Sequence, residues 1–374
     1  MIICYSGITY MHEHTPSQSK ETSELSPREL SRLRFSHEWQ RRAGRTTQKI
    51  AATALAATFL LQTDILLHKH ELDASDPRIH SIEQSDDELN QTGIVFIDGF
   101  GGQNGSWAAR SLESPITSMV EGDLLALEQD KDGISIKAVA REIANYAEQK
   151  QLTSLSLYGY SLGGVQAIKV AAILRDTYGI TVPFIFLDRV PSSGDMIKKK
   201  LRGQAIAFLD TVNAFHIKGT DIGIDIEYSR ILRGLFNAAS PNDISHLNNS
   251  STPFIIDQLS MGMTANTDAD IAELASDELP QPVMVYISSP HPEKDYFVDL
   301  TGSEEEFRQS AIDAGLDFVT ISVDAIHSRP DLSQPEYQAA YESMADELSL
   351  RRDTMNERYL FANGVTKYQQ LYPR

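Results

Sequence analysis

The chain has few cysteines and few basic residues. Its single cysteine among 374 residues is Cys4. One thiol excludes an intramolecular disulfide framework and a zinc site built from several thiolates. There are 33 lysines and arginines against 52 aspartates and glutamates, which gives a formal net charge of −19. A nucleic-acid-binding face needs clustered cations to neutralise phosphates, so this balance argues against a nucleic-acid partner.

The N-terminal region has an apolar run that is short for a membrane span. Residues 50–63 (IAATALAATFLLQT) carry no charge, and one aspartate separates them from three further apolar residues. A spanning helix needs roughly 20 apolar residues, so the run is of marginal length. Six lysines and arginines precede it between residues 32 and 49, and a basic flank before an apolar run is the layout of a signal sequence or signal anchor.

We therefore expect two N-terminal segments, a disordered and basic one over 1–48 and a possible signal anchor or N-terminal apolar helix over 49–68. An anchor would keep the basic flank in the cytoplasm and place the rest of the chain outside it. It would also allow membrane association. The alternative is an amphipathic or buried helix of a cytoplasmic protein.

Beyond residue 70 the pattern alternates between strands and helices. An amphipathic helix is expected over 135–151, where apolar residues recur at three- and four-residue spacing, and another helix is expected from Val165. Short β-rich apolar runs predict strands at 93–98, 123–128, 154–158, 184–187, 283–287 and 318–323. This order predicts an α/β fold with a mostly parallel sheet and helices on both faces.

The alternation fails for about 90 residues between Asp188 and Pro282. A loop of that length without structure is improbable in a compact domain. We therefore expect an inserted helical cap at about 190–280, within a main domain that covers 85–374.

The sharpest motif is a G-x-S-x-G, from Gly159 to Gly163 with Ser161 at its centre. An expected strand precedes it and an expected helix follows it, which is the setting where a serine hydroxyl is exposed on a tight turn. Gly159 and Gly163 are needed because side chains there would clash with the neighbouring strand and helix. Ser161 is therefore the candidate nucleophile.

A second glycine-rich loop, Asp98-Gly99-Phe100-Gly101-Gly102, follows the strand expected at 93–98. Acyl transfer to a serine needs two backbone N–H donors that hold the oxyanion of the tetrahedral intermediate. The residue after the nucleophile, Leu162, would supply one donor, and Phe100 would supply the other.

A general base and an acid that orients it should follow Ser161 in the sequence. Of the four later histidines, His327 lies just beyond the last expected strand, and His291 is the minor alternative. Asp295 is the preferred acid. Two alternative acids, Asp299 and Asp188, remain open at this point.

With these motifs in order, the segment of about 90–350 resembles the α/β-hydrolase superfamily. VFIDGFGGQNGSW is similar to the family's strand and oxyanion loop, although Asp98 stands where many members have histidine. KDYFVD is similar to the family's acid loop. The resemblance implies a lid-like cap over the site, formed by the insert.

The function expected is that of a serine hydrolase that cleaves an ester or thioester through an acyl-enzyme, with a small-molecule or lipid-like acyl substrate. This chemistry needs no metal and no organic cofactor. Two alternatives remain: a catalytically inactive binding module with the same fold, and an acyltransferase that uses the same three residues.

Overall fold

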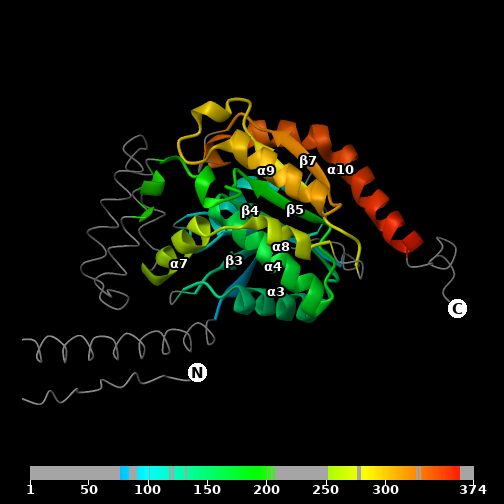
Figure 1. Ribbon diagram of the computed structural model, residues 1–374. Coiled ribbons are helices and arrows are strands. Elements are labelled where there is room, and N and C mark those ends of the chain that lie inside the picture. Colours follow the sequence, from blue (N-terminus) through cyan, green and yellow to red (C-terminus); the bar gives the residue numbers. More distant parts are fainter. Residues whose placement is uncertain are drawn as a thin grey trace, which may run out of the picture. The chain divides into compact units, whose positions relative to one another are not determined.

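The computed structural model describes residues 76–83 and 91–362, apart from 101, 118, 120–121, 131–132, 200, 204, 207–251, 276–278, 326 and 328–329 (Figure 1). The two N-terminal segments expected from the sequence, 1–48 and 49–68, lie outside these residues. Within the described ranges, no helix is both long enough and apolar enough to cross a membrane.

The described residues form a seven-stranded sheet with the strand order β1-β3-β2-β4-β5-β6-β7. All neighbouring strands pair in parallel except β1, which runs antiparallel to β3 at the edge of the sheet. The strands are β1 (Arg78–Glu83), β2 (Thr92–Ile97), β3 (Asp123–Glu128), β4 (Ser154–Tyr160), β5 (Phe184–Asp188), β6 (Val283–Ser288) and β7 (Asp317–Ser322).

Helices cover both faces of the sheet. On one face lie α3 (Ile136–Lys150), α4 (Leu162–Tyr178), α8 (Thr267–Glu273) and α9 (Leu300–Asp313), and on the other lie α2 (Ser106–Thr117) and α10 (Gln334–Ala362). A further helix, α7 (Thr252–Met263), packs against α4, and the short 3₁₀ helices are η1 (Gly194–Met196), η4 (Pro292–Lys294) and η5 (Pro330–Leu332). The predicted α/β class with a mostly parallel sheet is therefore confirmed.

The central strands are apolar throughout because both of their faces are buried. In β2, Val95 and Ile97 point into the core on the α3 and α4 face, whereas Ile94 and Phe96 point into the core on the α2 and α10 face. Successive side chains of a strand point to opposite faces, so a strand covered on both sides reads as a continuous apolar run. This is why short runs such as FIFL predict buried strands.

The stretch between β5 and β6 is helical where the structure describes it. It contains η1, helical residues between 199 and 206, α7 and α8. Of these, α8 packs against α4 and α9 and so forms part of the layer that covers the sheet. Residues 207–251 fall outside the described part of the chain. The domain boundaries, including a cap at about 190–280, therefore stay predictions.

The strand order changes direction at β2. From β2 the chain crosses one face through α2 to β3, and it then returns over the other face through α3 to β4, on the opposite side of β2. The loops that follow β2 and β4 therefore lie next to each other at the carboxyl edge of the sheet, where the strand order changes. In open parallel sheets, ligands bind at such a point.

Candidate active site

Ser161 lies on a strained turn between β4 and α4. Its backbone has φ of 50° and ψ of −125°, and α4 begins at the next residue, Leu162. A positive φ is uncommon for a residue with a side chain and persists where the surroundings enforce it. The N–H of Ser161 donates to the carbonyl of Asp188 over 2.8 Å, so the end of β5 supports the turn. This is the strand–turn–helix setting that the motif predicts.

The glycines of the motif lie where a side chain has no room. A Cβ on Gly163 would collide with the backbone carbonyl oxygens of Ile97 and Asp98, at the end of β2. A Cβ on Gly159 would collide with the backbone of Gly164. The missing side chains therefore let the turn approach β2 and its following loop closely.

His327 joins Ser161 to Asp295. The Nε2 atom of His327 lies 3.2 Å from the Oγ of Ser161, and its Nδ1 atom lies 2.7 Å from Oδ2 of Asp295. The two partners of this histidine come from different loops, one after β4 and one after β6. The side chains of His327 and Asp295 are only 5% and 3% exposed, so water screens their interaction weakly. Sequence reasoning named these three residues, and the structure brings them together.

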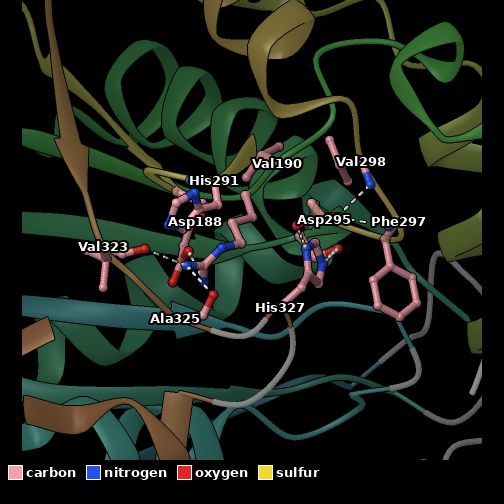
Figure 2. A network of polar contacts seen from close by, with 12 residues as sticks. Asp188, Val190, His291, Asp295, Phe297, Val298, Val323, Ala325 and His327 are labelled. Atoms are coloured by element: carbon pink, nitrogen blue, oxygen red, sulfur yellow. Dashed lines mark hydrogen bonds and ion pairs between the residues drawn. The ribbon is translucent and has the colours of Figure 1, made fainter. Parts of the chain in front are cut away.

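Asp295 is held as a carboxylate. Its Oδ1 atom accepts hydrogen bonds from the backbone N–H groups of Phe297 and Val298, at 2.8 and 2.9 Å (Figure 2). Burial raises the pKa of Asp295, but the adjacent His327 and the hydrogen bonds from His327, Val298 and Phe297 outweigh it and lower the pKa to about 2. A carboxylate only accepts hydrogen bonds, so the proton between the two side chains resides on Nδ1 of His327. Nε2 is then free to accept the proton of Ser161.

The alternative residues have other partners. Asp299 caps α9, where its side chain accepts the N–H of Gly302 over 3.2 Å. Asp188 is fully buried, and its Oδ2 accepts the hydroxyls of Tyr158 and Tyr337 at 2.6 and 2.7 Å. His291 is half exposed and lies 3.7 Å from a carboxylate oxygen of Glu293. The structure therefore places Asp295, and neither alternative acid, beside His327.

The loop after β2 lies beside Ser161, and α7 holds it in place. Nε2 of Gln258 in α7, which is fully buried, donates to the carbonyl of Gly99 over 2.7 Å. Phe100 and Leu162 line one cavity together with Ser161. The two residues expected to supply oxyanion donors thus line the same cavity as Ser161. No pattern in the sequence distinguishes Gln258 from other polar residues of the chain.

Asp98 begins this loop in a half-buried position. Burial raises the pKa of its carboxyl from 3.8 to about 6, against a hydrogen bond from the Gly99 N–H that lowers it. Because the folded state disfavours the charged form, the unfolded chain releases the proton at lower pH. The contribution of Asp98 to stability is therefore fully present below about pH 4 and is lost as the pH rises through about 6.

We expect Asp98→Asn to raise the free energy of unfolding by about 2 kcal/mol at neutral pH, after allowance for the part of the side chain that water reaches. The gain should vanish below about pH 4, where the carboxyl is neutral in both states. Urea unfolding across this pH range measures it, with the exposed Asp176→Asn in α4 as the control. A gain independent of pH would contradict the assignment.

A cavity of about 70 Å³ opens at Ser161. Every other residue of its wall is apolar: Phe100, Leu162, Pro191, Ile197, Leu201, Ala205, Leu259, Phe297 and Val298. Such a wall binds alkyl or aryl groups and offers no side chain for a charged group. Within the described part of the chain, no group of three or more His, Cys, Asp or Glu side chains is placed to hold a metal ion.

No protein-family model and no curated protein matches the sequence. Among solved structures, an esterase (EaEST) from Exiguobacterium antarcticum is similar at 12% identity and a TM-score of 0.49, over 74% of this chain and 96% of that one. MenH from S. aureus is similar at 14% identity and a TM-score of 0.47, over 73% and 98%. MGS-M2, an α/β hydrolase from a Medee basin deep-sea metagenome library, is similar at 16% and 0.45, over 72% and 94%. At this level the likeness concerns the fold and says nothing of the substrate.

Proposed function

We propose that the protein is a serine hydrolase that cleaves an ester or thioester through an acyl-enzyme intermediate. The observation that carries the proposal is the buried chain of contacts from Ser161 through His327 to Asp295, at 3.2 and 2.7 Å. A serine hydroxyl becomes a strong nucleophile when an oriented imidazole accepts its proton. Ser161 on its strained turn lines an apolar cavity, through which an acyl group would reach the hydroxyl.

In the first half of the reaction, Oγ of Ser161 attacks the acyl carbon while Nε2 of His327 accepts the hydroxyl proton. The oxygen of the tetrahedral intermediate receives hydrogen bonds from the backbone N–H groups of Leu162 and Phe100. The intermediate collapses when His327 returns the proton to the leaving alcohol or thiol, which leaves Ser161 acylated. Asp295 stays ionised and stabilises the imidazolium throughout.

In the second half, His327 accepts a proton from a water molecule, which attacks the acyl carbon of the ester at Ser161. A second tetrahedral intermediate forms, and its oxygen receives hydrogen bonds from the same two N–H groups. It then collapses to release the carboxylic acid. His327 then returns the proton to Oγ. The residues are restored to their starting state, and the substrate and water supply every atom of the products, so the proposed reaction needs no cofactor.

The apolar wall favours an alkyl acyl group, and the lipid-like substrate expected from the sequence belongs to this class. Each methylene that leaves water for such a wall contributes about 0.8 kcal/mol, or roughly a fourfold rise in kcat/KM. Along a series of p-nitrophenyl esters we expect kcat/KM to rise by about this factor per carbon from acetate until the cavity is filled. Activity on acetyl esters alone would remove the lipid-like substrate.

The same series tests whether this cavity holds the acyl group. Ala205 contributes a small side chain to the wall, and Ala205→Leu would fill part of the space. We expect this variant to hydrolyse acetate at nearly the wild-type rate but to lose about 10-fold in kcat/KM on the best longer ester. An unchanged chain-length profile would place the acyl group elsewhere.

A further inference from the structure

Two buried residues connect the turn of Ser161 with the loop of His327. Asp188 ends β5 and Arg189 follows it, and they are 0% and 1% exposed. The carbonyl of Asp188 accepts the N–H of Ser161 over 2.8 Å. The guanidinium of Arg189 donates through Nη2 to the carbonyls of Val323 and Ala325, at 3.1 and 3.2 Å (Figure 2). These carbonyls belong to the segment that leads from β7 to His327, and Ala325 lies two residues before it.

The guanidinium is itself fixed by its neighbours. Nη1 of Arg189 donates to the hydroxyl of Tyr337 over 2.9 Å and lies 3.4 Å from Oδ1 of Asp188. Tyr158 and Tyr337 in turn donate to the other oxygen of Asp188. An arginine presents its donors in a rigid planar fork, which suits it to hold two carbonyls at once.

The backbone of Arg189 is strained. Its φ is 52°, a left-handed conformation that long side chains rarely adopt. Its N–H donates to the carbonyl of Ile287 in β6 over 3.0 Å. Strain of this kind persists where several contacts enforce one conformation. Ser161 and Arg189 are thus two strained residues at the ends of neighbouring strands, joined through Asp188.

We propose that Asp188 and Arg189 form a positioning element, which sets the distance between Oγ of Ser161 and Nε2 of His327. Its catalytic consequence rests on the function proposed above. The segment after β7 is also held to β6, where the N–H of Val323 donates to the carbonyl of Ser288 over 3.0 Å, and Arg189 adds two hydrogen bonds nearer to His327. A displacement of about 1 Å at a reacting group can cost about 10²-fold in rate.

The test compares two buried arginines. Arg175 in α4 is 4% exposed and also donates to backbone carbonyls, those of Pro280 over 2.5 Å and Leu279 over 3.4 Å, which lie ahead of β6 and not in the loop of His327. We expect Arg189→Met to lower kcat by about 100-fold with KM changed less than about threefold, and Arg175→Met to leave kcat within about threefold. Arg189→Lys keeps the charge but replaces the planar fork by a single nitrogen, so its kcat should recover to about 10-fold below wild type.

Proton NMR measures the position of His327, which Asp188 and Arg189 are proposed to set, without any substrate turnover. The Nδ1 proton of His327, bound to the carboxylate of Asp295, should give a far-downfield resonance in the wild type and in Arg175→Met, and it should broaden or vanish in Arg189→Met. If Arg189→Met alone does not fold, the double variant Asp188→Asn and Arg189→Met, which leaves no unpaired buried charge, takes its place.

Equal kcat and equal resonances in Arg189→Met and Arg175→Met would overturn the positioning role. So would the absence of the resonance in the wild type, because the role presupposes the ordered contact of His327 with Asp295. A wild-type protein that shows the resonance but hydrolyses no ester or thioester would instead refute the proposed function, and the resonances would still decide on positioning.

Discussion

Ser161→Ala should lower kcat for ester hydrolysis by about 10⁴-fold or more, because Ser161 is the residue that forms the acyl-enzyme in the proposed mechanism. In the proposed mechanism the lost oxygen is the atom that attacks the acyl carbon and gives its proton to His327. Alanine adopts the strained backbone as readily as serine does, so the free energy of unfolding should change by less than about 1 kcal/mol. Steady-state kinetics on a p-nitrophenyl ester, together with urea unfolding, measure both effects.

A serine in the strand that leads to Ser161 provides the control. Ser156 in β4 is 1% exposed, and its hydroxyl makes no hydrogen bond in the described part of the chain. Ser156→Ala removes the same atom five residues earlier, and we expect it to leave kcat unchanged. Residual activity of Ser161→Ala within about 10-fold of wild type would mean that another group is the nucleophile.

Asp295→Asn should lower kcat by about 10³- to 10⁴-fold while the protein stays folded. The carboxylate fixes the proton of His327 on Nδ1 and stabilises the imidazolium that forms when Ser161 is deprotonated. An amide can instead donate to Nδ1, which moves the ring proton to Nε2 and removes the acceptor for the serine hydroxyl. The loss should fall on kcat, with KM nearly unchanged, in steady-state kinetics on the same ester.

Asp299→Asn is the matched control for this change. Asp299 lies four residues further along the same loop, where it caps α9, and asparagine is an equally good cap. We expect wild-type kcat and stability. A large loss of kcat in Asp299→Asn, with little loss in Asp295→Asn, would mean that Asp299 and not Asp295 is the acid that orients His327.

Features that depend on short stretches of sequence could be predicted. The expected helix over 135–151 is α3, which Ser135 caps at its start and which ends at Gln151 in a left-handed conformation. The strand expected at 184–187 extends by one residue in β5. Ser161 was predictable for the same reason, since its turn is coded by the glycines around it.

Contacts between distant segments were only partly predictable. Chain order placed Asp295 and His327 after Ser161, but it left Asp188 and Asp299 open, because a carboxylate's partner depends on how the loops fold together. No local pattern distinguishes Arg189, whose role arises from carbonyls more than 130 residues further along the chain. Arginine side chains are seldom buried, so the residue type alone predicts an exposed position for Arg189.

The first strand and the last helix of the described domain, β1 and α10, were not among the elements expected from the sequence. The edge strand β1 carries only exposed and half-buried residues, so it lacks the apolar run that marks the central strands. In α10, the buried residues Tyr337, Tyr341 and Leu348 recur at helical spacing, and this spacing could have predicted the helix.

The most direct measurement of the central claim is labelling with a fluorophosphonate, which reacts with an activated serine hydroxyl, followed by peptide mass spectrometry. The account predicts one adduct, on Ser161 of the wild type, with no adduct in Ser161→Ala and at least about 100-fold slower labelling in His327→Ala. A folded wild-type protein that is not labelled, or labelling of Ser161 at an equal rate in His327→Ala, would contradict it.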